Sequence, residues 1–208
     1  MLQIKDQPQI AEWVKYNPHH DELGRFASGS GGGGAGLVGF SQIPNEEQSY
    51  FLDHTFGGAQ KRMSDTGAEA FEGYLRNNYR TINSELRGQY KGEPLEYLSS
   101  AKQIKALDTV TKSATIPKNI VVYRGVSGVT FRKGQIVTDK AFLSTTVSFE
   151  NAKSFAGNAG YIVRIGVPKG TKASCGTGHE REIVFPRGKK LKIAEVHSDG
   201  TVDAVMLL

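Results

Sequence analysis

Two glutamates, Glu180 and Glu182, stand one residue apart just before a short apolar run at residues 183–185. Successive side chains of a β-strand point to opposite faces, so a strand here would place both carboxylates on one face and Arg181 on the other. Their Cα atoms would lie about 6.5 Å apart, two steps of the rise along a strand. Such a pair suits a reaction with a cationic transition state and a cationic acceptor. The alternative is an exposed strand end with alternating charges.

Two other predicted strands end in polar residues that can do chemistry. Arg124 follows an apolar strand and precedes Gly125, and its planar guanidinium is well shaped for a phosphate or a carboxylate. The alternative for Arg124 is a structural ion pair. Ser144, Thr145 and Thr146 end the next long strand and offer hydroxyls that can orient a carboxylate, although a run of β-branched residues is also common in plain strands.

The composition fits one folded domain, since 38% of the 208 residues are apolar. The net charge is only +5 and the cations are scattered, which argues against a nucleic-acid-binding surface. The single Cys175 excludes an intramolecular disulfide, and the histidines lack ligand spacing, so no metal site is predicted. The sequence shows neither a signal peptide nor a transmembrane run, so we expect synthesis in a bacterial cytoplasm and no membrane partner.

Residues 1–36 are predicted to be a flexible N-terminal segment that ends in a glycine-rich linker at residues 29–36. The folded domain is predicted to span residues 37–208. The stretch at residues 17–28 resembles segments of bacteriophage head proteins. This resemblance implies a phage-encoded, virion-associated protein that acts in the host cytoplasm, and docking on a phage head or delivery partner is our hypothesis for the N-terminal segment.

The first half of the domain has the periodicity of helices. Thr66 and Glu69 form a capping box, and an apolar face with three- and four-residue steps follows from Phe71 to Leu86 and stops at Gly88. A second helix is predicted from Pro94 to Val110. Three polar residues of the first helix, Tyr79, Asn83 and Arg87, are interpreted as ordinary surface neighbours.

The second half changes to the period of strands, and a short helix is predicted at residues 149–155. Asp199 and Gly200 predict a C-terminal hairpin turn, and the small residues 174–178 predict a flexible loop. Helices followed by strands indicate an α+β fold with antiparallel pairing. The predicted strands are Ile120–Arg124, Gln135–Val137, Ala141–Thr146, Tyr161–Val167, Glu182–Phe185, Leu191–Val196 and Val202–Leu207.

The order of the three motifs resembles the signature of the mono-ADP-ribosyltransferases, in which an arginine, a Ser-Thr-Ser motif and a Glu-x-Glu motif follow one another. The sequence is most similar to the branch that contains the catalytic subunits of actin-modifying binary toxins. The similarity extends to residues 79–87, 167–171 and 182–188, and covers the chain from about Asn45 to its end. It implies an ADP-ribosyltransferase fold, in which NAD lies across two perpendicular antiparallel β-sheets flanked by N-terminal helices.

The resemblance also implies which residues bind NAD. Arg124 would hold the NAD phosphates, with Tyr123 and Gly125 beside it in the cofactor site. Thr145 and Thr146 would shape the nicotinamide side. Thr146 departs from the family, which usually has serine at this position, but threonine keeps the hydroxyl, so we expect activity with a modest loss at most.

The catalytic residues implied by the resemblance are Ser144, Glu180 and Glu182. Ser144 would bind both NAD and Glu182, and would orient the latter. Glu182 would stabilise the oxocarbenium ion as nicotinamide leaves. Glu180 marks the arginine-modifying branch and would hold the acceptor guanidinium by a charge-assisted hydrogen bond. Residues 174–179 would form the mobile loop that presents the target, and His179 has no assigned role.

The predicted function is therefore NAD-dependent transfer of ADP-ribose to an exposed arginine of a target protein, with release of nicotinamide. Two alternatives stay open at this point. An enzyme of the same fold could mainly hydrolyse NAD or modify a different side chain, and a phage head-associated structural protein could carry a degenerate domain. Secretion as a toxin is the alternative to delivery by a phage.

Overall fold

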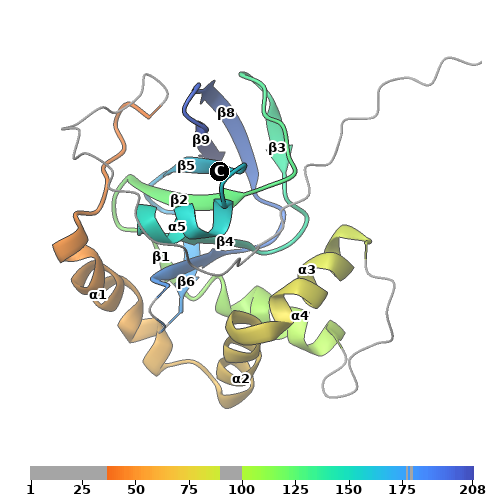
Figure 1. Cartoon of the computed structure of the whole chain (residues 1–208). Coiled ribbons are helices and arrows are strands. Elements are labelled where there is room, and N and C mark those ends of the chain that lie inside the picture. The colour runs from red at the N-terminus through yellow and green to blue at the C-terminus, as the bar shows by residue number, and fades with distance from the viewer. Residues whose placement is uncertain (1–36, 90–99, 177, 179) are drawn as a thin grey trace, which may run out of the picture.

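The computed structural model describes residues 37–89, 100–176, 178 and 180–208, in which helices precede most of the strands (Figure 1). A short 3-10 turn at Asn45–Glu47 leads into the helices, which are α1 (Gln48–Lys61), α2 (Asp65–Gly73), α3 (Tyr79–Arg87), α4 (Ser100–Val110) and α5 (Phe149–Ala156). The strands are β1 (Ala114–Thr115), β2 (Ile120–Val126), β3 (Ile136–Thr138), β4 (Leu143–Thr146), β5 (Tyr161–Val167), β6 (Lys172–Cys175), β7 (Glu182–Phe185), β8 (Lys190–Val196) and β9 (Thr201–Leu207). This arrangement confirms the predicted α+β class.

The long amphipathic helix predicted from the sequence is confirmed as a continuous helical run, in which a π-helical turn at Tyr74–Asn78 joins α2 to α3. The run begins earlier than predicted: the Oγ of Ser64 accepts the N–H of Gly67 at 3.2 Å, so Ser64 and not Thr66 is the N-cap. It ends at Gly88, as predicted, because a φ of 75° favours glycine.

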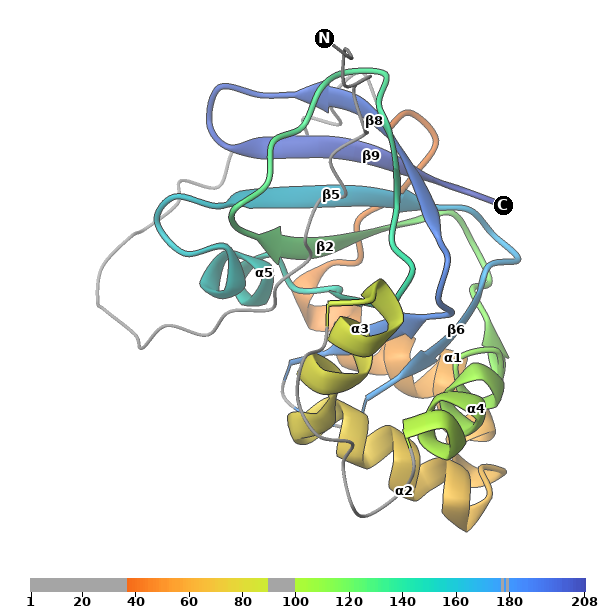
Figure 2. The same cartoon turned by 90° about the vertical axis from the view of Figure 1, so that its right-hand side faces the viewer.

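Two of the remaining helices were predicted and one was not. The helix predicted to end at Val110 is confirmed over α4, whereas its predicted start at Pro94 lies outside the described residues. The short helix α5 is confirmed. Helix α1 was not predicted, because glycines and polar residues interrupt its apolar spacing. Figure 2 shows α2, α3 and α4 gathered on one side of the strands, and α5 beside β2.

The strands of the described residues form one hydrogen-bonded sheet in the order β1-β6-β7-β4-β2-β5-β9-β8-β3. Every predicted strand is present, as is the hairpin between β8 and β9, while β1 and β6 are additional. The pairing between β2 and β4 is short and consists of one register pair, Tyr123 with Thr146. The two sheets expected from the resemblance thus correspond to the two halves on either side of this junction.

The expectation of antiparallel pairing fails for one pair of neighbours, because β5 and β9 run parallel. Parallel neighbours require a long crossover connection. Here the connection from β5 to β9 contains β6, β7 and β8, and β9 then pairs with β5. The pattern of strands in the sequence does not show which strands become neighbours in the sheet.

Alternation along β7 divides its side chains between two apolar clusters. Ile183 and Phe185 are fully buried in the main core, an apolar cluster that also contains Phe56 of α1. Val184 points to the other face and packs in a second cluster with residues of α2, α3 and α4. Glu182 shares the face of Val184, since the two residues are two positions apart on the strand.

The predicted N-terminal segment, its glycine-rich linker and the phage-like stretch all lie outside the described residues. The domain boundary at residue 37 therefore stays a prediction. The described part begins at Leu37, which is buried against Val121 and Tyr123 of β2. None of the helices in the described part of the chain is long and apolar enough to cross a membrane.

Candidate active site

A pocket lies where β2, β4 and β7 meet, with α5 as one of its walls. It brings together all eight residues that the sequence analysis placed in a site: Tyr123, Arg124, Gly125, Ser144, Thr145, Thr146, Glu180 and Glu182. Ala152 and Phe155 of α5 also line the pocket, and these two residues were not predicted. The fold thus joins three motifs that are far apart in the sequence.

Arg124 crosses the junction between the two halves of the sheet. Its Nη1 donates a hydrogen bond from β2 to the backbone carbonyl of Ser144 on β4, at 2.5 Å. Arg124 is only 7% exposed, and this burial lowers the pKa of its guanidinium, while the negative charge of Asp139 acts in the opposite direction. A guanidinium held in the wall of a pocket supplies a fixed positive charge for an anionic ligand.

The two glutamates reach the pocket in different ways. Glu182 is the first residue of β7, pairs with Thr146 and is buried. Glu180 lies in the turn before β7 and is exposed, and Arg181 between them has a φ of 49°, in the left-handed region. Strand alternation was therefore the wrong reason for grouping the two carboxylates. The turn at Arg181 brings Glu180 to the pocket.

The predicted loop at residues 174–179 is partly a strand. Ser174 and Cys175 belong to β6 and pair with β7, whereas Thr177 and His179 lie outside the described residues. Small polar residues have weak strand propensity, so the local pattern carried no strand signal, and the hydrogen bonds with β7 decide the conformation. Cys175 is buried, and its burial is the main reason why the pKa of its thiol is raised to about 12.

A chain of hydrogen bonds connects the helices to β4 beside the pocket. The Nδ2 of Asn83 donates to the hydroxyl of Tyr74 at 3.0 Å, and this hydroxyl lies 3.1 Å from the Oγ of Ser144. An amide nitrogen can only donate, so the Tyr74 hydroxyl accepts from Asn83. Either hydroxyl of the Tyr74 and Ser144 pair can be the donor, and the Tyr74 hydroxyl also lies 3.5 Å from the carbonyl oxygen of Phe142. The chain of hydrogen bonds thus fixes the Ser144 hydroxyl on the strand face that also carries Glu182.

The Tyr74 hydroxyl keeps its proton over the physiological pH range. Burial is the largest cause that raises its pKa to about 12; the hydrogen bond with Ser144 lowers the pKa, and the negative charge of Glu182 raises it. The role of Tyr74 is not predicted from the sequence, because its position belongs to the apolar stripe of the helix. One signal was available in the sequence. The apolar stripe predicts that Tyr74 is buried, and a buried tyrosine hydroxyl requires a hydrogen-bond partner.

The interpretation of Asn83 and Arg87 as surface residues was wrong, because Asn83 is buried and the side chain of Arg87 is only 6% exposed. The Nε and Nη2 of Arg87 donate to the two carboxylate oxygens of Asp139, at 3.0 and 2.8 Å. Asp139 also accepts the backbone N–H of Ala141 at 3.0 Å. This ion pair ties the end of α3 to the segment that leads into β4, and so helps to fix the strand that carries Ser144.

Gly125 lines the pocket and also allows α5 to lie directly against β2. A Cβ atom on Gly125 would be 2.0 Å from the carbonyl oxygen of Ala152 and 2.4 Å from the nitrogen of Ala156. Both of these are backbone atoms of α5. Glycine is therefore required here for the close approach of the helix, which positions Ala152 and Phe155 in the pocket.

The described residues contain no group of three or more His, Cys, Asp or Glu side chains that could hold a metal ion. The pocket instead combines a buried guanidinium with one buried and one exposed carboxylate. A cation suits the phosphates of a substrate, and a carboxylate stabilises positive charge on a sugar ring. This combination of charges suits the transfer of a glycosyl group from a phosphorylated sugar.

Comparison with known proteins identifies the family. A model described as ADP-ribosyltransferase exoenzyme matches residues 48–207, so the chain belongs to this family. No curated protein matches the sequence. The family assignment confirms the resemblance on which the sequence analysis relied.

Solved structures with a similar fold include bacterial toxins. BECa, an ADP-ribosylating toxin of a binary enterotoxin of C. perfringens solved with NADH, has a TM-score of 0.66 at 20% identity, over 81% of this chain and 50% of that chain. Plx2a, an ADP-ribosyltransferase toxin from Paenibacillus larvae, has a TM-score of 0.67 at 16% identity, over 81% and 100%. An ADP-ribosyltransferase from Clostridium botulinum has a TM-score of 0.64 at 16% identity, over 80% and 98%. This chain therefore spans about half of the BECa chain and nearly all of the other two, and the likeness confirms the ADP-ribosyltransferase fold.

Proposed function

We propose that the protein is an NAD-dependent mono-ADP-ribosyltransferase that modifies arginine side chains of a target protein and releases nicotinamide. The observation that carries the proposal is the convergence of Arg124, Ser144, Glu180 and Glu182 on one pocket. Membership of the ADP-ribosyltransferase exoenzyme family supports NAD as the donor of ADP-ribose. The second glutamate of the pocket supports arginine as the acceptor.

In the proposed reaction, NAD binds with its phosphates at Arg124 and its nicotinamide ribose at Glu182. The bond between C1′ of the ribose and the nicotinamide nitrogen breaks, and the bonding electrons leave with nicotinamide. Positive charge then develops on the ribose ring. The carboxylate of Glu182 stabilises this charge, and because Glu182 is buried the interaction is only weakly screened by water. The hydrogen-bonded chain of Asn83, Tyr74 and Ser144 fixes the serine hydroxyl on the strand face that carries Glu182.

The proposed acceptor is the guanidinium of a target arginine. The exposed Glu180 accepts hydrogen bonds from this guanidinium and places one of its nitrogens at C1′. The nitrogen forms the new bond to C1′ and releases its proton to the solvent. Glu182 is not accessible to the target arginine, since it is buried at the start of β7. The two carboxylates therefore act on the two opposite partners of the reaction.

The test is the release of nicotinamide from NAD by the purified protein, with and without agmatine as an arginine analogue. We expect release that agmatine increases, together with formation of ADP-ribosyl-agmatine. Release without stimulation by agmatine would indicate an NAD glycohydrolase. The absence of both turnover and NAD binding would indicate a degenerate structural domain.

Two matched substitutions separate the roles of the carboxylates. Glu182→Gln should lower both activities by orders of magnitude without unfolding the domain. Glu180→Gln should retain NAD hydrolysis and lose transfer to agmatine. An equal loss of both activities in Glu180→Gln would instead assign Glu180 to the cleavage of NAD.

A further inference from the structure

The backbone carbonyl of Glu180 is held by two side chains from different elements. The Oγ1 of Thr146 on β4 donates to it at 2.7 Å, and the Nδ2 of Asn151 on α5 donates at 2.9 Å. A carbonyl oxygen has two lone pairs, so these two bonds use its accepting capacity. We refer to Thr146 and Asn151 together as the Glu180 clamp.

Both donors of the Glu180 clamp are themselves fixed. The Oγ1 of Thr146 accepts the N–H of Ser148 at 3.0 Å, which commits the hydroxyl proton to Glu180. Ser148 is the N-cap of α5, and its Oγ accepts the N–H of Asn151 at 3.3 Å. The end of β4 and the first turn of α5 therefore form one connected frame that presents both donors to the same carbonyl.

Arg181 is anchored on the other side of the turn. Its Nη1 donates to the Oε1 of Gln48 on α1, and its carbonyl accepts the N–H of Val147 at 3.3 Å. Gln48 is buried, and its Nε2 donates to the carbonyl of Val147 at 3.0 Å. These bonds hold Arg181 in a left-handed conformation that is unfavourable for a residue with a side chain. The turn that carries Glu180 is thus held from both sides against its local preference.

We propose that Asn151 is a positioning residue that determines whether ADP-ribose is transferred to arginine or to water. The inference rests on the proposed function. Glu180 reaches the pocket only through this turn, so loss of a clamp bond lets the strained turn relax and displaces its carboxylate. Glu182 is held separately by the pairing of β7 with β4, so the cleavage of NAD does not depend on the clamp in the same way.

The test compares wild type and Asn151→Ala for the two products of the same reaction, ADP-ribosyl-agmatine and free ADP-ribose. We expect the ratio of transfer to hydrolysis to fall about tenfold, the effect of one hydrogen bond of ordinary strength. The KM for agmatine should rise, while the KM for NAD should stay within about twofold of the wild-type value. Glu150→Ala is the matched control, because Glu150 is the exposed neighbour of Asn151 on α5.

A second pair of variants tests the other donor of the clamp. Thr146→Val removes the hydroxyl at nearly constant shape, and Thr146→Ser retains it. The ratio of transfer to hydrolysis should fall in Thr146→Val and recover in Thr146→Ser. Because Thr146 also lines the pocket, only the ratio is compared and not the absolute rates.

The outcomes separate this inference from the proposed function. If the wild type forms no ADP-ribosyl-agmatine, the proposed function is overturned, and the inference with it. If the wild type transfers to agmatine but the ratio is unchanged in Asn151→Ala, the inference alone is overturned, whatever the result for Thr146→Val. An equal fall of both products in these variants would indicate a purely structural role and would also overturn it.

Discussion

The hydroxyl oxygens of Tyr74 and Ser144 lie 3.1 Å apart, one on the π-helical turn and the other on β4. Tyr74 is fully buried, and its hydroxyl also accepts the hydrogen bond from Asn83. Through this contact the helices meet the strand that lines the pocket. The π-helical turn coincides with the contact, as such turns often do at functional sites.

The first prediction concerns this hydroxyl. Tyr74→Phe removes the partner of Asn83 and Ser144, so the serine is no longer oriented and the buried amide loses an acceptor. We expect about a tenfold fall in the kcat of nicotinamide release and a loss of about 1–2 kcal/mol in the free energy of unfolding. Steady-state kinetics and urea titration measure the two effects. Tyr50→Phe serves as the control because Tyr50 is 71% exposed, and equal kcat values in the two variants would contradict the prediction.

A second prediction concerns the contact of α5 with β2. In Gly125→Ala, the new methyl group would overlap backbone atoms of α5, which cannot move aside as a side chain does. We expect destabilisation of at least about 3 kcal/mol and loss of activity. Gly57→Ala on α1 is the control, since a Cβ atom there meets nothing within 4 Å and alanine favours a helix. Thermal unfolding measures the stability of both variants. An unchanged Tm in Gly125→Ala would show that the contact of α5 with β2 does not require glycine at this position.

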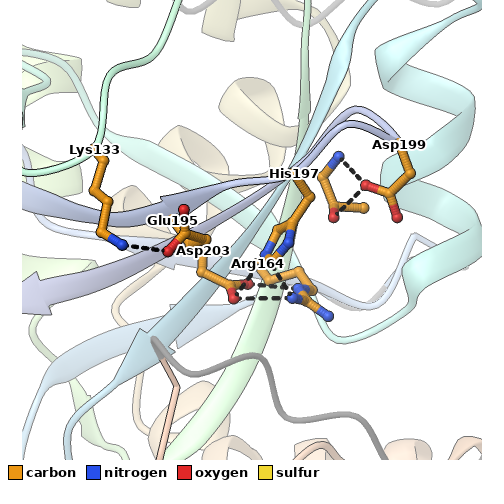
Figure 3. Close-up of polar contacts among 7 residues, drawn as sticks. Lys133, Arg164, Glu195, His197, Asp199 and Asp203 are labelled. Carbon is orange, nitrogen blue, oxygen red and sulfur yellow. Dashed lines mark hydrogen bonds and ion pairs between the residues drawn. The ribbon is translucent and has the colours of Figure 1, made fainter.

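A third prediction compares two ion pairs of the same part of the sheet (Figure 3). The fully buried Asp203 accepts from the Nε and Nη2 of Arg164 at 2.6 and 2.9 Å, and its Oδ2 lies 3.1 Å from the Nε2 of His197. Lys133 and Glu195 form an exposed pair at 2.6 Å. Asp203→Asn leaves a half-buried arginine without its counter-charge and should cost about 3–5 kcal/mol.

The matched substitution Lys133→Ala should cost less than about 1 kcal/mol, because water screens an exposed pair. Urea unfolding measures both free energies. Similar values for the two variants would show that burial does not determine the contribution of Asp203. The folded fraction of each variant should retain its activity, since neither residue lines the pocket.

A fourth prediction follows from the pKa of Cys175, which burial raises to about 12 in the folded protein. In the unfolded chain a cysteine has a pKa of about 8.5. The folded state holds the thiol proton more tightly than the unfolded chain, so the protonated thiol contributes to the free energy of unfolding. This contribution is complete below the pKa of the unfolded chain and is lost as the pH rises toward the pKa of the folded protein. Between pH 7 and pH 10 the wild type should therefore lose about 2 kcal/mol more than Cys175→Ala.

Urea unfolding at the two pH values measures this difference, and the tyrosines cancel because both proteins contain them. A difference between wild type and variant that is the same at pH 7 and pH 10 would mean that the thiol ionises equally in both states. The same burial predicts that the native protein resists thiol alkylation at pH 8, whereas the unfolded protein reacts.

The sequence by itself determined the elements whose signals are local. Short apolar runs between turn residues predicted the bounds of β5 and β7, and periodicity with a terminal glycine predicted the helix that ends at Gly88. The order of three motifs pointed to the family and to all eight residues that meet in the pocket. These inferences hold because strand and helix periods arise from backbone geometry within a few residues.

The tertiary structure decided what depends on residues far apart in the chain. Residues with weak strand propensity form β6 by pairing with β1 and β7, and the side chain of Arg87 is enclosed as the ion-pair partner of Asp139. Glu180 reaches the pocket through a turn whose Arg181 is anchored to Gln48, 133 positions earlier. No local pattern encodes such contacts, since each pairs one segment with a distant one whose position the whole fold sets.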